Sequence, residues 1–279
     1  MFKSVGLVAR FDRKRAVRLV EDLADRLSKN GLDVYLEDTL AQKTEARWKT
    51  LPLDGMKTDL IVTVGGDGTI LRACLSLPKP EPPILAVNMG IRGFLTEVEP
   101  GRVFDAVDRC LKGEYTTEKC MKLAANADNT AFPDALNEIV VTHDEPAKLL
   151  YLRILKAGEP ILNCQADSLL VSTQTGSTGY SLSAGGPVLD PGVDAFVLTP
   201  VCPLTDFRPI VFPADSRLTI QALKPRKMLI LIDGQYTRTI SSRIPSVTIT
   251  RSKHETSFIR FREDFYHRLK SRLMFKATE

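Results

Sequence analysis

Hydrophobic and polar positions alternate along the first hundred residues in a way that predicts strands separated by helices. Four apolar runs have the length of buried strands: 5–9, 34–36, 60–64 and 84–87. The stretch 14–29 repeats apolar residues every three or four positions, and Asn30-Gly31 follows as a helix stop. Shorter helical patterns occupy 70–77 and 103–111. This alternation predicts a parallel sheet covered by helices on both faces.

Beyond residue 100 the pattern changes to short β-rich runs separated by turn residues such as Asp233-Gly234. The runs are 139–142, 149–155, 168–172, 195–198, 217–222, 228–232 and 247–250. They predict a mostly antiparallel domain of the β-sandwich type. We therefore expect an α/β N-terminal domain with a Rossmann-like parallel sheet over 1–100 and a mostly β C-terminal domain over 101–255.

The last segment, 256–279, carries an apolar stripe that predicts a terminal helix. Phe261, Phe265, Leu269 and Leu273 are four residues apart, with Arg and Lys between them. A helix that packs this stripe on the body of the protein is the simplest interpretation. A helix on a membrane surface or against a partner is the alternative.

Composition narrows the class of protein without identifying it. The 279 residues are 43% hydrophobic and 26% charged, and the formal net charge of +4 gives no indication of nucleic-acid binding. No apolar run approaches the length of a membrane span, and the N-terminal MFKSVGLVAR lacks the features of a signal peptide. Five cysteines without a CxxC pair argue against a zinc site or a disulfide framework. We expect a soluble, cytoplasmic protein.

The stretch DLIVTVGGDGTILRA, 59–73, contains the first candidate chemistry. Its apolar run ends in Gly-Gly-Asp-Gly-Thr, and a helical pattern resumes at once. A glycine turn that opens a helix presents backbone N–H groups to phosphate, but this one has neither the P-loop lysine nor the GxGxxG spacing. Asp67 would be repelled by phosphate unless it accepts a proton or orients a metal. The alternative is that Asp67 is an ordinary turn residue or helix cap.

A second unusual stretch is QADSLLVSTQTGSTGYSLSAGGPVL at 165–189. It begins with the pattern of a buried strand and continues as a run of Ser, Thr and Gly. Such a run offers hydroxyl and N–H groups to phosphate, ribose or amide groups. Tyr180 within it is suited to stacking on a heterocycle. The alternative, a flexible Ser/Gly linker, fits poorly because strand patterns flank the run.

Together these motifs resemble the NAD kinase family. The GGDGT turn at 65–69, the pair Asn137-Glu138 and the TQTGSTGYSLSAGGP block occur in the family's order, followed by TPVCPLTDFRP at 199–209 and Asp233-Gly234-Gln235. The resemblance covers about residues 59–235. GGDGT alone is also found in diacylglycerol, sphingosine and phosphofructokinase relatives, whereas the combination is specific.

The resemblance implies transfer of the γ-phosphoryl group of ATP, or of polyphosphate, to the 2′-hydroxyl of the adenosine ribose of NAD, giving NADP. Asp67 would be the proton acceptor, with Gly66 and Gly68 against the dinucleotide and Arg72 near phosphate. Magnesium or another divalent cation would accompany ATP, and no residue is assigned as a metal ligand. The other implied dinucleotide-binding residues are Asn137, Glu138, Lys148, Gln165, Asp167, Thr178, Gly179, Tyr180, Ser181, Leu182, Ser183 and Gln235.

The resemblance further implies a site between two domains, a C-terminal segment that returns to the first domain, and a homodimer or homotetramer. The three histidines at 143, 254 and 267 have no implied role, and we interpret them as structural. This sequence departs from the family pattern at Gln174, Gly179, 166–168 and 203–205, which bears on the preference for NAD or NADH.

Two other functions remain open at this stage. A lipid or sugar kinase would share the GGDGT turn, and a catalytically idle dinucleotide-binding module would share the second block. The Asn-Glu pair and the TGST-Tyr block speak against the first, and Asp67 speaks against the second. The sequence leaves open the phosphoryl donor and regulation by NADP(H).

Overall fold

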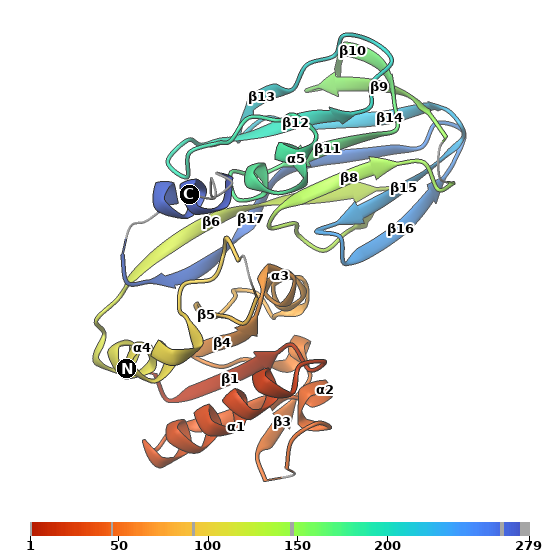
Figure 1. The fold of residues 1–279 in the computed structure, drawn as a ribbon. Coiled ribbons are helices and arrows are strands. Elements are labelled where there is room, and N and C mark those ends of the chain that lie inside the picture. The colour runs from red at the N-terminus through yellow and green to blue at the C-terminus, as the bar shows by residue number, and fades with distance from the viewer. Residues whose placement is uncertain (1, 46, 91–92, 146–147, 263–264, 274–279) are drawn as a thin grey trace. The chain divides into compact units, whose positions relative to one another are not determined.

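The computed structural model describes residues 2–45, 47–90, 93–145, 148–262 and 265–273, with side chains described through residue 270. The chain forms two compact units (Figure 1). The first contains residues 1–119 and 256–279, and the second contains 120–255.

The first unit is built on a parallel sheet. Its strands are β1 (Ser4–Ala9), β2 (Asp33–Glu37), β3 (Lys49–Leu51), β4 (Leu60–Gly65) and β5 (Ile84–Asn88). They lie in the order β5-β4-β1-β2-β3, and the end of β17 (Ser246–Arg260) pairs in parallel with β5. β4 is buried along its whole length, as expected for a strand covered on both faces.

The unit also contains helical elements, several of which cover the sheet with an apolar side. The elements are α1 (Lys14–Lys29), α2 (Asp38–Ala41), α3 (Asp67–Ser76), α4 (Val103–Lys112), α6 (Phe265–Leu273) and the 3₁₀ turns Leu53–Gly55 and Pro100–Arg102. The buried sides of α1 and α4 join one hydrophobic core with the strands, and α3 lies on the other face (Figure 1). The helix predicted over 14–29 is confirmed at both ends.

The second unit consists of antiparallel sheets. One has the order β13-β12-β11-β8-β15-β16, and the other contains β10, β9, β14, β17, β6 and β7. The bounds are β6 (Thr116–Ala127), β7 (Thr130–Ala131), β8 (Glu138–Thr142), β9 (Leu150–Lys156), β10 (Glu159–Ala166), β11 (Ser168–Ser172), β12 (Ala195–Val201), β13 (Ile210–Pro213), β14 (Leu218–Lys224), β15 (Lys227–Ile232) and β16 (Tyr236–Ser241). Buried residues alternate along β9, β14 and β15, as in sheets with one face on a core. A 3₁₀ turn, Gly176–Thr178, and α5 (Tyr180–Ser183) follow β11.

The predicted fold class is confirmed: a parallel α/β unit, an antiparallel β unit, and a C-terminal segment that returns to the first unit. The first unit extends to residue 119, beyond the change of pattern near residue 100, because α4 contributes Val103, Val107 and Cys110 to its core. The terminal helix begins at Phe265, while Phe261 directly follows β17. The side chain of Leu273 lies outside the described residues.

Candidate active site

One candidate region lies in the first unit, where the order of the parallel sheet reverses. β1 and β4 are neighbours, but the chain continues from β1 to β2 on one side and from β4 to β5 on the other. A backbone hydrogen bond of 3.0 Å from Arg10 to the Val64 carbonyl joins the ends of the two strands. In open α/β sheets, ligands bind at the carboxyl ends of strands at such a switch point.

The GGDGT turn occupies this position. Gly66 is the extended residue before α3, and Asp67 is the first residue of the helix. A Cβ atom added at Gly66 or Gly68 would meet no atom within 4 Å, so the space beside the turn is open to a ligand. Orphan N–H groups and the helix dipole make the N-terminus of α3 favourable for phosphate.

The Asp67 carboxylate is held by the backbone of a different segment. Its Oδ2 accepts the Phe94 N–H at 2.7 Å, and its Oδ1 accepts the Leu95 N–H at 3.1 Å. Gly93 allows this approach, since a Cβ atom there would lie 2.4 Å from the Thr96 hydroxyl and 3.2 Å from Asp67 Oδ1. A carboxylate oxygen can accept more than one hydrogen bond, so these two contacts fix the orientation of Asp67 without making it a donor.

Arg72 of α3 is held by residues at the ends of β1 and β2. Its guanidinium forms an ion pair with the buried Glu37 carboxylate and donates to the Ala9 carbonyl at 3.2 Å. The Phe11 ring lies 5.8 Å from the guanidinium carbon. Glu37 therefore offsets the charge that Arg72 was expected to place near phosphate.

Another candidate region, in the second unit, surrounds the Asn137-Glu138 pair at the start of β8. The buried Asp233 carboxylate accepts the N–H groups of Leu136, Asn137 and Glu138 at 2.7, 2.8 and 2.9 Å. Burial raises the pKa of Asp233, while the three N–H donors and the nearby Lys122 ammonium act in the opposite direction. This carboxylate fixes the backbone that carries the pair.

Glu138 is poised for a polar partner. Burial, and secondarily the charge of Asp233, raise the pKa of Glu138 to about 8. Within the described part of the chain, Glu138 Oε2 and Asn137 Oδ1 are buried and have no hydrogen-bond partner. Buried polar atoms are nearly always satisfied, so these two indicate the position of a ligand.

The TGST block packs directly on this pair. Thr173 Oγ1 donates to the Leu136 carbonyl at 2.6 Å and accepts the Gly176 N–H at 3.0 Å. Gly176 approaches so closely that an added Cβ atom would lie 2.0 Å from the Asn137 carbonyl oxygen. The Cβ position of Gly179 is 3.8 Å from Glu138 Oε2. Asn137, Glu138 and Gly179 therefore lie close together in the second unit.

The other predicted residues of this unit differ in their exposure and in their hydrogen-bond partners. Tyr180 is 46% exposed, the Ser181 hydroxyl bonds the Thr199 hydroxyl at 2.8 Å, and Gln235 is exposed in the turn after Asp233. Thr178 lies in the 3₁₀ turn and Leu182 and Ser183 lie in α5, whereas Gln165, Asp167 and Lys148 belong to the segments around β10 and before β9. Lys148 is exposed.

Two departures from the family pattern have structural roles here. Gln174 donates through Nε2 to the Val193 carbonyl at 2.7 Å, and the Ser168 hydroxyl donates to the Thr142 hydroxyl at 2.8 Å. Both hold segments of the second unit together without altering the Asn137-Glu138 pair.

Sequence reasoning missed the groups that position the site rather than touch a ligand. Asp233 was noted only as part of a family segment, and its Asp-Gly dipeptide was the available signal. Glu37 and the N–H groups of Phe94 and Leu95 carried no signal, because a backbone donor has no signature in sequence.

The described residues contain neither a cluster of potential metal ligands nor a membrane-spanning helix. No group of three or more His, Cys, Asp and Glu side chains in these residues is arranged to hold a metal ion. None of the helices among them is long and apolar enough to cross a membrane.

Comparison with known proteins places both units in one family. Residues 5–115 match the ATP-NAD kinase N-terminal domain, and residues 136–261 match the ATP-NAD kinase C-terminal domain. The NAD kinase of Methanothermobacter thermautotrophicus is 38% identical over 97% of this chain and 96% of its own length. The NAD kinase of Thermococcus kodakarensis is 40% identical over 94% of this chain and 95% of its own length.

Solved structures agree with these matches. An NAD kinase from Archaeoglobus fulgidus in complex with ATP aligns with a TM-score of 0.80 and 27% identity, covering 96% of this chain and 97% of that one. Yeast NADH kinase complexed with NADH aligns with a TM-score of 0.88, covering 99% of this chain and 90% of that one. Its sequence identity is 23%, so this match shows a common fold alone. The chain therefore belongs to the NAD kinase family.

Proposed function

We propose that this chain transfers the γ-phosphoryl group of ATP to the 2′-hydroxyl of the adenosine ribose of NAD, giving NADP, and that Asp67 accepts the proton of that hydroxyl. Membership of the NAD kinase family supports the reaction. The observation that supports the role of Asp67 is its position at the N-terminus of α3, at the switch point of the parallel sheet.

Phosphoryl transfer asks the protein for positioning and charge stabilisation more than for covalent chemistry. The N-terminus of α3 supplies N–H groups and a positive dipole end to the phosphate chain. Asp67, fixed by the N–H groups of Phe94 and Leu95, accepts the ribose proton as the oxygen attacks phosphorus. Magnesium arrives with ATP as part of the substrate and neutralises phosphate charge.

The second unit supplies polar groups for the dinucleotide. Asn137 Oδ1 and Glu138 Oε2 are buried and unsatisfied within the described residues, which suits them to the hydroxyls and amide of NAD. With its pKa raised to about 8, Glu138 carries a proton at neutral pH and donates a hydrogen bond. The exposed Tyr180 ring and the neighbouring Gly179 and Ser183 complete the proposed binding surface.

An NAD analogue tests the proposed position of transfer. We expect the purified protein to form NADP from NAD, ATP and magnesium, and to consume no ATP when the adenosine ribose lacks its 2′-hydroxyl. Turnover with this 2′-deoxy analogue would contradict the proposed acceptor. Replacing ATP by polyphosphate, and NAD by NADH, in the same assay measures donor and acceptor preference. A lipid or sugar kinase would instead phosphorylate its own substrate and leave NAD unchanged.

The family resemblance also motivates a homodimer or homotetramer and a cytoplasmic location without nucleic-acid or membrane partners. These remain predictions. Analytical ultracentrifugation of the purified chain tests the first, and a single species of monomer mass would contradict it.

A further inference from the structure

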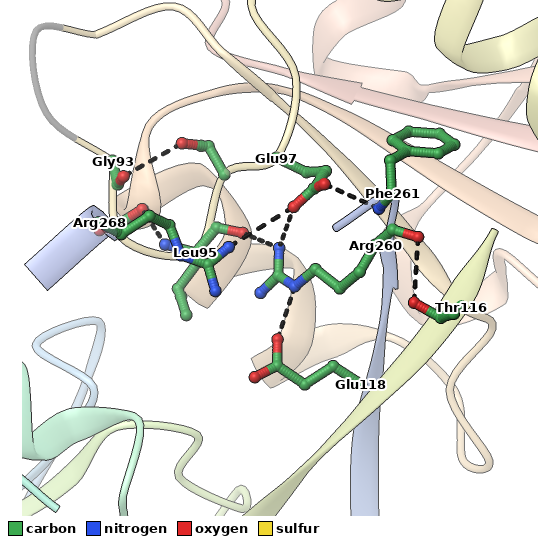
Figure 2. Close-up of polar contacts among 10 residues, drawn as sticks. Gly93, Leu95, Glu97, Thr116, Glu118, Arg260, Phe261 and Arg268 are labelled. Atoms are coloured by element: carbon green, nitrogen blue, oxygen red, sulfur yellow. Dashed lines mark hydrogen bonds and ion pairs between the residues drawn. The ribbon is translucent and has the colours of Figure 1, made fainter. Parts of the chain in front are cut away.

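A charged cluster around Arg260 in the first unit contacts Leu95, one of the two residues whose N–H groups hold Asp67. Leu95 donates its N–H to Asp67 Oδ1, and its own carbonyl oxygen accepts a hydrogen bond of 2.9 Å from Arg260 Nη1. The same residue is thus held on one side by the guanidinium and holds the carboxylate on the other. Figure 2 shows Arg260 between Leu95, Glu97 and Glu118.

Arg260 is fixed at several points. It is the last residue of β17, and its side chain is 6% exposed. Its Nε donates to Glu118 Oε2 at 2.6 Å, and its Nη1 lies 3.4 Å from Glu97 Oε2. The planar fork of arginine can satisfy a carbonyl and two carboxylates at once, whereas a lysine ammonium on a flexible stem cannot reproduce that geometry.

Glu97 connects the cluster to the C-terminal segment. Its Oε1 accepts the Phe261 N–H at 2.8 Å, and its Oε2 lies 3.5 Å from Arg268 Nη1 of α6 (Figure 2). The ring of Phe265 in the same helix contacts the Phe94 ring edge-on, with 5.5 Å between centroids. Thus Phe94 and Leu95, the two donors to Asp67, both contact the C-terminal segment.

We propose that Arg260 is a positioning residue for Asp67, which acts by fixing the Leu95 peptide that holds the carboxylate. The inference rests on the proposed role of Asp67 as proton acceptor. Arg260 makes no contact with substrate in this account. It restricts Asp67 to the orientation in which one lone pair meets the ribose hydroxyl, because small displacements of a catalytic group are costly.

A double-mutant cycle separates positioning from a general loss of structure. We expect Arg260→Lys to lower kcat about tenfold or more, with the KM for NAD changed less than about twofold, because geometry at the reacting atoms is lost while binding is kept. In an Asp67→Asn background, the same substitution is expected to change the residual kcat by less than about twofold, because its effect requires the carboxylate. Equal losses in both backgrounds, or no loss in either, would overturn the inference.

A control on the same strand measures the effect of disturbing β17 alone. The Thr256 hydroxyl is buried and donates to Glu81 Oε2 at 2.6 Å, away from the Leu95 contact. Thr256→Val is expected to lower the unfolding midpoint and leave kcat within about twofold, because it removes a buried hydrogen bond. A tenfold loss of kcat in Thr256→Val would refute a specific role for Arg260.

Two outcomes distinguish this inference from the proposed function. If Asp67→Asn keeps the wild-type kcat, both the base assignment and the inference fail. If Asp67→Asn lowers kcat but Arg260→Lys leaves kcat at the wild-type value, only the inference fails. Should Arg260→Lys not fold, Glu118→Gln takes its place in the cycle. It weakens one contact of the guanidinium from a half-buried position, and we expect a smaller loss of kcat with the same dependence on Asp67.

Discussion

Glu138→Gln tests the electrostatics of the second unit through the pH dependence of stability. Burial raises the pKa of Glu138 from an ordinary 4.5 to about 8. Between these values the folded protein binds more protons than the unfolded chain, so the free energy of unfolding falls as pH rises. The difference between a pKa of 4.5 and one of about 8 corresponds to a free energy on the order of 5 kcal/mol.

Glutamine mimics the neutral carboxyl and cannot ionise, so the comparison isolates this group from other titrating residues. We expect wild type and Glu138→Gln to have similar free energies of unfolding near pH 5. Above pH 8 the variant should be more stable by several kcal/mol, a large part of the total stability of a domain. Urea unfolding followed by tryptophan fluorescence and circular dichroism at a series of pH values measures the difference. If the free energies of unfolding of the two proteins changed in parallel from pH 5 to 9, Glu138 would not have a raised pKa in the folded protein.

Two further predictions concern close packing and buried charge. Gly176→Ala is expected to destabilise the protein by about 3 kcal/mol or more and to weaken NAD binding, because its Cβ atom would lie 2.0 Å from the Asn137 carbonyl oxygen. Gly68→Ala, whose Cβ atom meets nothing within 4 Å, is the control, and equal thermal midpoints for the two variants would contradict the packing argument. Arg72→Gln is expected to destabilise the protein by about 3–5 kcal/mol, because it leaves the buried Glu37 carboxylate without its cation. Urea unfolding tests this, and an unchanged midpoint would show that Glu37 is stabilised in another way.

The parts of the fold that follow a strict period could be predicted from the sequence. The apolar residues of 14–29 repeat at helical spacing, and the structure places α1 at the predicted bounds. β6 was not predicted, because its sequence TTEKCMKLAANA lacks a continuous apolar run. Lys122 within it is fully buried, so a charged residue occupies a core position where the pattern favours an apolar one.

The length of β17 shows the effect of tertiary context. Only 247–250 had the apolar pattern of a strand, yet the strand runs from Ser246 to Arg260. It pairs with β14 over its first part and with β5 near Phe258. Its polar middle section extends because neighbours satisfy its backbone, which a local pattern cannot reveal.

The candidate residues that could be singled out from the sequence are those that belong to motifs. Asp67 was singled out as a carboxylate between glycines at the start of a helix, and the Asn137-Glu138 pair by its place in the family order. The groups that hold them, such as the Leu95 peptide and Asp233, lie 28 residues from Asp67 and 96 residues from Asn137 respectively. Only the folded chain brings them together.

The rate of NADP formation by Asp67→Asn beside wild type, with NAD, ATP and magnesium, tests the role of Asp67 as proton acceptor. Asparagine keeps the size of the side chain and removes its capacity to accept a proton. We expect kcat to fall by about two orders of magnitude or more while the Kd for NAD stays within a few-fold, because general-base catalysis contributes on that scale. A variant that binds NAD and turns over at the wild-type rate would show that Asp67 is not the proton acceptor.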